Sequence, residues 1–212
     1  MDRRELLKMV ALLTGGVVIG GDVFLSGCKT GAKGDAGFTA SHMALLDEVG
    51  ETIIPATATP GAKAAKVGEF MRIMVTDCYT ENQQTAFTKG ISDLDEACKK
   101  VTGKSFMDCT PQERHDFLVG LEKEAKAYNI KRDEEDKPKK EALKEANSKL
   151  LWKDQKEFES APSHYYTMIK QLTLFGFFSS KTGMTETLRH IPVPGKYDGA
   201  YPYAKGDKAW AE

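Results

Sequence analysis

Apolar residues recur every three or four positions along most of the chain between residues 39 and 175, and charged residues fill the positions between them. An α-helix turns once in 3.6 residues, so this spacing gathers the apolar side chains on one face and predicts amphipathic helices. Helices are expected from Thr39 or Ser41 to Pro55, over residues 67–79 and 82–102, from Thr110 onward, and over residues 162–175.

The expected core stripes are Met43, Leu46, Val49 and Ile53; Phe70, Met71, Met74 and Cys78; Phe87, Ile91, Leu94, Cys98 and Val101; Phe117, Leu118, Leu121 and Ala125; and Tyr165, Ile169, Leu172 and Phe175. No segment alternates as a strand would. The pattern therefore predicts an all-α bundle of about five to six helices over residues 39–175.

Local signals mark several helix ends. Gly103 is well placed to cap the C-terminus of the third helix, because glycine adopts the left-handed conformation without cost. Thr110 and Glu113 have the spacing of a capping box, with Pro111 at the first helical position. Residues 130–149 are densely charged with both signs and contain Pro138, which predicts an exposed loop followed by a helix from about Lys139. The sequence leaves open whether this segment is an insertion or a contact site.

Residues 172–203 mix clustered aromatics with glycines and prolines, so they can neither continue as one helix nor alternate as a strand. We expect residues 176–212 to form a long, irregular, mostly extended C-terminal arm. The arm is too apolar to be a solvated linker. It must therefore lie against its own domain or against another subunit.

The first 28 residues have the features of a bacterial export signal. Arg3 and Arg4 precede an apolar stretch that is too short and too glycine-rich to span a bilayer comfortably, and Leu25-Ser26-Gly27-Cys28 resembles a lipobox. We expect residues 1–27 to be a twin-arginine signal peptide, Cys28 to carry lipid, and residues 28–38 to be a flexible tether. The protein would then hang from the periplasmic face of a bacterial membrane, and Lys29 after the cysteine slightly favours the outer membrane.

Two runs carry a family resemblance. ETIIPATATPGA at residues 51–62 and LTLFGFFSSKTGMTETLRHIPVPGKYDGAYP at residues 172–202 resemble the N-terminal and C-terminal signatures of the gluconate 2-dehydrogenase subunit 3 family. The resemblance implies a small, exported, non-catalytic subunit of a flavin-dependent sugar, sugar-acid or polyol dehydrogenase. It also implies that FAD belongs to the partner subunit, that a cytochrome c subunit can complete the complex, and that the small subunit supplies the export signal.

On this reading the arm binds the catalytic subunit. The residues expected at that interface share an apolar or aromatic side chain in or next to the arm. They are Phe175, Phe177, Phe178, Met184, Pro192, Pro194, Tyr197 and Tyr201. Buried aromatic anchors supply most of the binding energy in such interfaces.

The chain shows no catalytic, cofactor-binding or metal-binding motif. The net charge of -1 and the absence of a basic patch argue against a nucleic-acid partner. The four histidines are isolated, and there is no H-E-x-x-H, C-x-x-C-H or G-x-S-x-G motif and no G-x-G-x-x-G between a strand and a helix. We therefore expect no active site in this chain.

Three cysteines remain beside Cys28. Cys98 near the end of one helix and Cys109 just before the next could be brought within disulfide distance by a tight helical hairpin, and export would permit the bond. Cys78 would then stay free as a small buried apolar residue. The spacing does not favour a three-cysteine metal site.

A different class of function stays open at this point. The chain could be a free-standing lipoprotein that binds a carbohydrate, with the arm folded back over an aromatic pocket. The pocket would use Trp152, Tyr165, Tyr201 or Trp210. An arm closed around a cavity would favour this alternative, and an exposed apolar patch would favour the subunit.

Overall fold

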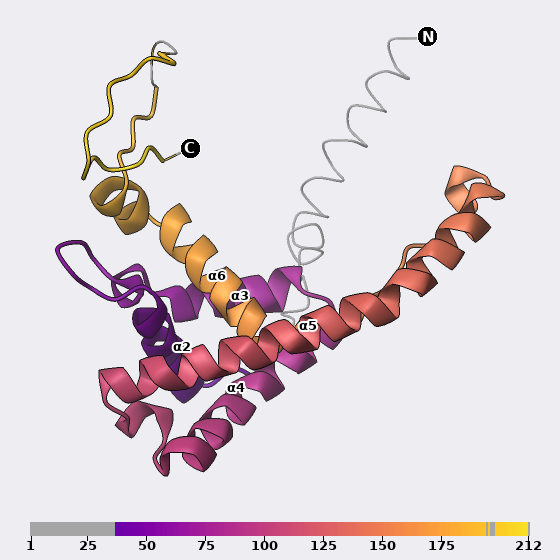
Figure 1. The fold of residues 1–212 in the computed structure, drawn as a ribbon, viewed down its shortest axis with the longest axis horizontal. Coiled ribbons are helices and arrows are strands. Elements are labelled where there is room, and N and C mark those ends of the chain that lie inside the picture. Colours follow the sequence, from indigo (N-terminus) through magenta and orange to yellow (C-terminus); the bar gives the residue numbers. More distant parts are fainter. Residues whose placement is uncertain (1–36, 194, 196–197, 212) are drawn as a thin grey trace, which may run out of the picture. The chain divides into compact units, whose positions relative to one another are not determined.

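The computed structural model describes residues 37–193, 195 and 198–211. Within these ranges every regular element is helical, and the β-type pairing is a single isolated bridge between Arg189 and Trp210. The predicted all-α class is therefore confirmed (Figure 1). Arg3, Arg4, Cys28, Pro194 and Tyr197 lie outside the described residues.

The elements in chain order are α2 (Ala40–Ile53), η1 (Ala62–Ala65), α3 (Val67–Cys78), α4 (Glu81–Thr102), η2 (Phe106–Asp108), α5 (Pro111–Ser148), η3 (Trp152–Asp154), α6 (Tyr165–Ser179) and the π-helical turn η4 (Gly183–Thr187).

The helix ends follow the local signals in the sequence. Thr39 caps α2 by accepting a hydrogen bond from the backbone N–H of His42. Thr110 and Glu113 form the predicted capping box at the start of α5. Gly103 ends α4 in the left-handed conformation with φ of 76°. Each of these groups satisfies backbone atoms that a helix terminus leaves unpaired.

Helix α6 is the centre of the bundle, because it contacts α2, α3, α4 and α5. Glycines allow this close packing. A Cβ at Gly90 of α4 would lie 2.2 Å from the Cβ of Tyr165, and a Cβ at Gly176 of α6 would lie 2.6 Å from the ring of Phe70. The core around α6 contains the large, fully buried side chains Phe87, Phe106, Ile169 and Phe177.

Three expected core residues are on the surface instead. Cys78, predicted to be buried, is exposed, Val101 is 74% exposed, and Phe175 is 56% exposed. In α3 the apolar side chains that face the core are Val67, Met71 and Val75. Met71 was predicted there, but Val67 and Val75 were not.

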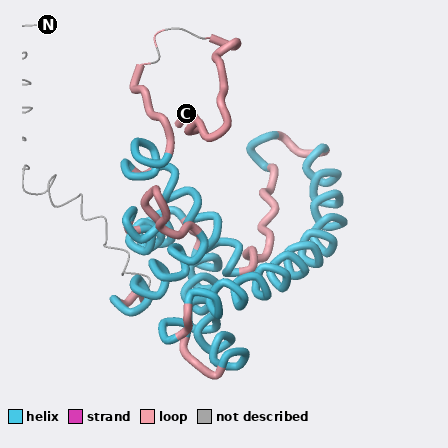
Figure 2. Tube along the Cα trace, turned by 60° about the vertical axis from the view of Figure 1, so that its left-hand side comes forward, coloured by secondary structure: helices cyan, strands magenta, loops and turns pink. Residues whose placement is uncertain are grey.

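The charged segment is helical rather than a loop followed by a helix. Helix α5 runs without interruption through residues 130–149 as far as Ser148, with Pro138 inside it. The chain then returns alongside its distal half, as Figure 2 shows. Five residues of α5, spaced three, four, four and seven positions apart in the sequence, contact the segment that returns along the helix. The pairs are Asn129 with His164 (3.0 Å), Arg132 with Ser163 (2.7 Å), Asp136 with Ser160, Lys140 with the Phe158 ring (5.3 Å), and Asn147 with Lys156 (2.8 Å).

The C-terminal arm begins later than predicted and is not extended. Helix α6 continues to Ser179, and η4 follows as a π-helical turn, in which a Cβ at Gly183 would lie 2.0 Å from the carbonyl oxygen of Phe177. The chain after η4 closes on itself. The backbone of Arg189 donates to Ala209 (2.8 Å) and accepts from Ala211 (2.9 Å). We call residues 189–211 the C-terminal loop.

Candidate partner-binding face

Helix α6 has an unusual composition for a helix with one side open to solvent. Its sequence, YYTMIKQLTLFGFFS, is apolar all round, with Lys170 and Gln171 as its long polar side chains. A helix of this kind is normally surrounded by protein. Here only one side is covered, since Ile169, Leu172 and Phe177 are buried.

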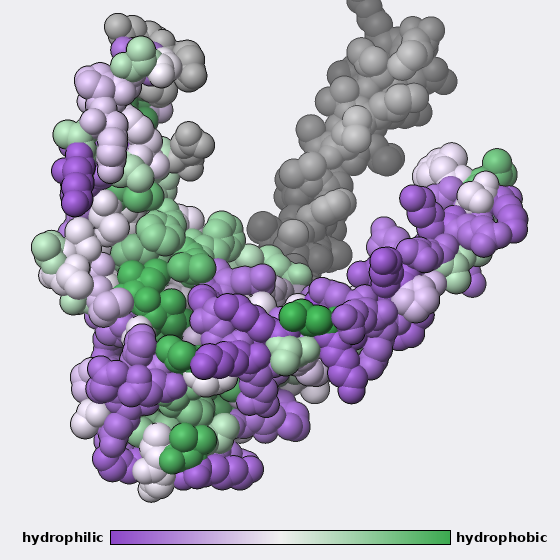
Figure 3. All heavy atoms as spheres, viewed as in Figure 1, coloured by the Kyte–Doolittle hydropathy of each residue, from purple (hydrophilic) through white to green (hydrophobic). Residues whose placement is uncertain are grey.

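The uncovered side of α6 presents Leu174, Phe175 and Phe178 to solvent, and Phe175 is 56% exposed. At about 100° per residue these three positions span roughly a 100° arc, which is the width of a packed helix face. Figure 3 shows apolar side chains gathered over α6.

Helix α3 extends this apolar surface. Phe70 packs on the space left by Gly176, and its ring meets that of Phe175 edge-on with centroids 5.5 Å apart. Ile73, one turn further along α3, is also exposed. We call Phe70, Ile73, Leu174, Phe175 and Phe178 the α3–α6 face. Exposed apolar side chains gathered on one surface are typical of sites where another protein, a membrane or a ligand binds.

The predicted interface residues that the structure describes divide between four environments. Phe175 and Phe178 belong to the α3–α6 face, and Met184 is half-buried in η4. Phe177 is fully buried, so its prediction as an interface residue is wrong: its ring fills the core and meets the neighbouring Phe178 ring edge-on, with centroids 5.1 Å apart. Pro192 and Tyr201 lie in or near the C-terminal loop.

Sequence reasoning missed Phe70, Ile73 and Leu174. The signal in the sequence that points to Leu174 is the missing polar stripe of α6. Nothing local could have identified Phe70 and Ile73, because their place beside α6 depends on the tertiary packing of α3.

Arg189 closes the C-terminal loop from the inside. Its guanidinium lies 4.7 Å from the centroid of the Trp210 ring and 5.6 Å from that of Tyr201, and Nη1 donates to Tyr201 Oη at 3.0 Å. Lys208 Nζ donates to the carbonyl oxygen of Glu186. Cation–π contacts of this kind hold the loop in a defined shape.

The first signature is a loop organised by one carboxylate. Glu51 accepts hydrogen bonds from the backbone N–H of Ala56 (2.8 Å) and of Lys63 (2.9 Å). A Cβ at Gly61 would lie 2.3 Å from this carboxylate, so glycine is required there for space. Ala62 of the first signature and Thr173 of the second both lie against Gly50, since a Cβ built there would lie 3.4 Å from the Ala62 Cβ and 3.6 Å from the Thr173 methyl group. The two signatures thus form one continuous region.

A buried ionic cluster fixes α2 beneath this region. Glu48 pairs with Lys63 of η1 and with Arg114 of α5, and both Glu48 and Arg114 are largely buried. The hydrogen bond from Lys63 and the nearby Arg114 charge hold the pKa of Glu48 below its usual value. Arg114 also donates to the carbonyl oxygens of Phe106 (2.9 Å) and Met107 (2.7 Å). The cluster serves to position α2, η1, η2 and α5.

The aromatic residues of the carbohydrate-pocket alternative are spread over separate places. Tyr165 lines an open groove of about 650 Å³ between α4, α5 and α6, together with Tyr128 and His164, and Trp152, Tyr201 and Trp210 are not in its wall. Burial raises the pKa of Tyr165 to about 12 and lowers that of His164. Trp152 is exposed, and Tyr201 and Trp210 pack in the C-terminal loop. The four therefore do not make a common pocket.

The described ranges contain neither a candidate metal site nor a candidate membrane-spanning helix. No group of three or more His, Cys, Asp or Glu side chains is arranged to hold a metal ion in this part of the chain. None of its helices combines the length and apolarity needed to cross a bilayer.

Comparison with known proteins gives one match. The family model described as "Gluconate 2-dehydrogenase subunit 3" matches residues 40–195, which include α2 to η4 and both signature regions. No curated protein and no solved structure matches the chain.

Proposed function

Because the chain belongs to the gluconate 2-dehydrogenase subunit 3 family, we propose that it is the non-catalytic small subunit of a flavin-dependent sugar, sugar-acid or polyol dehydrogenase. In this proposal FAD is held by the catalytic subunit, and a cytochrome c subunit can accept its electrons. The small subunit would assist export through Arg3 and Arg4, anchor the complex through lipid on Cys28, and stabilise the catalytic subunit at the periplasmic face of the membrane.

The observation that supports this role most strongly is the α3–α6 face. Fully burying an apolar side chain of this size is worth about 1.5–3 kcal/mol, and the face leaves several such side chains partly in water. A catalytic subunit seated on the face would gain that free energy.

The C-terminal loop is proposed as a second contact region. Tyr201 and Trp210 are already held against Arg189, so little conformational entropy remains to be lost when a partner binds them. The loop would therefore act as a preformed contact, in place of the extended arm expected from the sequence.

The test is complementation of a strain that lacks this chain. Envelope fractions are assayed for electron transfer from gluconate, glucose, fructose and sorbitol to an artificial acceptor dye. We expect the deletion to abolish one of these activities and the wild-type chain to restore it.

A double variant then locates the interface. Phe175→Ser with Phe178→Ser should fold, because both side chains are exposed, but should weaken subunit binding about 10- to 100-fold and fail to restore activity. Leu150→Ser with Leu151→Ser is the matched control, since it changes two exposed apolar residues near the end of α5 and should restore activity fully. Unchanged activity in the deletion strain would contradict the function. Rescue by the phenylalanine variant would contradict the placement of the interface.

A further inference from the structure

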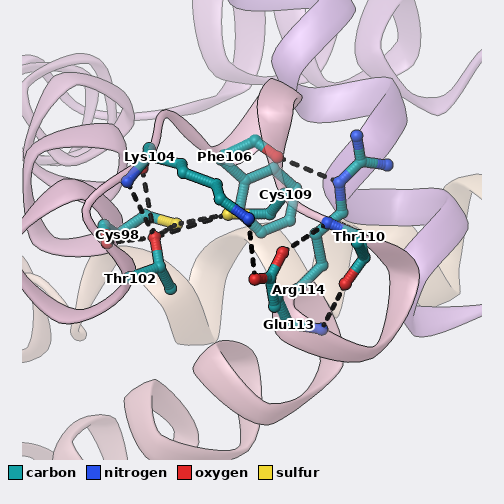
Figure 4. A network of polar contacts seen from close by, with 8 residues as sticks. All are labelled: Cys98, Thr102, Lys104, Phe106, Cys109, Thr110, Glu113 and Arg114. Carbon is teal, nitrogen blue, oxygen red and sulfur yellow. Dashed lines mark hydrogen bonds and ion pairs between the residues drawn. The ribbon is translucent and has the colours of Figure 1, made fainter.

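The junction between α4 and α5 brings two cysteines into contact. The Sγ atoms of Cys98 and Cys109 are 3.6 Å apart, and both residues are buried and free. Thr102 Oγ1 lies 3.7 Å from Cys98 Sγ and 3.4 Å from Cys109 Sγ, as Figure 4 shows. A disulfide has sulfur atoms about 2.05 Å apart, so the two Sγ atoms must approach by about 1.5 Å, which small side-chain rotations can supply.

The backbone around the two thiols is fixed on every side. Thr102 Oγ1 donates to the carbonyl oxygens of Cys98 (2.8 Å) and Lys104 (3.2 Å), and Asp95 accepts from the backbone N–H of Phe106 (2.8 Å). Lys104 pairs with Glu113 at 2.9 Å. That ion pair, together with the capping hydrogen bonds of Thr110, lowers the pKa of Glu113 to about 2. These contacts hold both cysteines in place before any bond forms.

We propose that Cys98 and Cys109 are a preset dithiol that oxidises to an intramolecular disulfide when the chain meets a disulfide oxidant. The bond would link the end of α4 to the start of α5, next to the place where Arg114 pairs with Glu48. It would therefore stabilise the end of the bundle that positions α2.

The reaction is an ordinary thiol–disulfide exchange. One cysteine thiolate attacks the oxidant's disulfide, which forms a mixed disulfide and releases one oxidant thiolate. The second cysteine thiolate then attacks the mixed disulfide, forms the Cys98–Cys109 bond and releases the second oxidant thiol. The chain loses two protons and two electrons, and the oxidant disulfide gains both to become a dithiol.

The order of attack follows from the surroundings. Cys98 is fully buried and Cys109 is 5% exposed, so an oxidant in solution reaches Cys109 first. Burial also raises the pKa of the Cys98 thiol, which lowers its thiolate fraction at neutral pH. Oxidation of the folded chain should be slow and should accelerate in mild denaturant, which opens η2.

Trypsin separates the two cysteines cleanly. Cleavage after Lys89, Lys99, Lys104 and Arg114 places Cys98 in GISDLDEACK and Cys109 in SFMDCTPQER, and cleavage after Arg72 places Cys78 in a third peptide. The purified full chain is reduced, equilibrated with reduced and oxidised glutathione, alkylated in denaturant and digested. We expect the two peptides to appear mostly as one disulfide-linked pair, with Cys78 alkylated. Recovery of both peptides mainly alkylated or glutathionylated, or linkage to Cys78, would overturn the proposal.

Thermal unfolding gives a second readout. Reduction should lower the Tm of the oxidised wild-type chain by roughly 5–10 °C, because it releases a short closed loop. Cys78→Ser is the matched control and should keep this shift, whereas Cys109→Ser should lose it. A wild-type chain whose Tm does not respond to reduction would contradict the stabilising role.

The same peptide mapping, applied to protein whose free thiols are alkylated inside native cells, tests disulfide formation and export separately. A linked pair there supports both. If the two cysteines bond to each other in the glutathione mixture but are found alkylated in cells, the dithiol proposal stands and export to an oxidising compartment is contradicted.

Discussion

Glu48 joins three elements of the bundle through its two carboxylate oxygens. One oxygen pairs with Arg114 of α5 and the other with Lys63 of η1, while Glu48 itself belongs to α2. Glu48 and Arg114 are only 16% and 13% exposed. Removing one member of such a pair leaves the other charge poorly solvated, which costs more than the pair contributes when both are present.

We predict that Glu48→Gln lowers the free energy of unfolding by about 2–3 kcal/mol in urea denaturation at pH 7. The folded-state pKa of Glu48 is lowered, so the stabilisation is present above the ordinary value of 4.5 and is lost as pH falls below it. As the pH falls from 5 toward the folded-state pKa of Glu48, the free energy of unfolding of the wild-type chain should therefore decrease more than that of the variant.

Glu145→Gln is the control for this prediction. Glu145 pairs with Lys149, and both side chains are about three-quarters exposed, so the change should stay within about 0.5 kcal/mol. Equal effects of the two substitutions would contradict a structural role for the Glu48 cluster.

Two glycines inside helices give opposite predictions for the same substitution. A Cβ at Gly90 would collide with Tyr165, whereas a Cβ at Gly120 meets nothing within 4 Å. Gly90→Ala should destabilise the chain by about 1–3 kcal/mol through overpacking against α6. Gly120→Ala should stabilise it by about 0.5–1 kcal/mol, because alanine favours the helix. Thermal unfolding measures both, and a stabilising Gly90→Ala would show that α4 and α6 are not packed as described.

At the scale of elements, local chemistry predicted helix boundaries where the signal lies next to the boundary. The capping box at Thr110 and the glycine cap at Gly103 depend on neighbouring residues alone, and both were predicted correctly. Pro138 was expected to mark a loop, but α5 continues through it. Side-chain bonds such as that of Asp136 to Ser160 hold the helix on both sides of the proline, and no local pattern reveals a partner 24 residues away.

We predict that Pro138→Ala slows backbone hydrogen exchange in residues 138–148. Proline cannot donate a hydrogen bond to the carbonyl of residue 134, and its ring crowds that carbonyl, so its replacement restores one helical bond in α5. Lys137→Ala is the control, because it leaves the proline in place and should not slow exchange. Equal protection in all three chains would indicate that the tertiary contacts alone fix the distal half of α5.

At the scale of the whole molecule, the sequence predicted the class, the family and two of the five residues of the α3–α6 face. Its two signatures were separate runs, and the structure brings them together where Ala62 and Thr173 both lie against Gly50. Phe177 was assigned to the interface as one of the clustered aromatic residues in or next to the predicted arm, and the structure buries it in the core. Only the direction of each side chain around α6 separates core from surface, and that depends on which side the other helices cover.

We propose that this chain binds a flavin-containing dehydrogenase. Affinity capture of the tagged full chain from its native envelope, followed by the visible absorption spectrum of the captured material, tests this binding. We predict a larger partner subunit with flavin absorbance that bleaches when a sugar, sugar acid or polyol is added. A chain that is captured alone and colourless, from an envelope in which the dehydrogenase activity is present, would contradict the account.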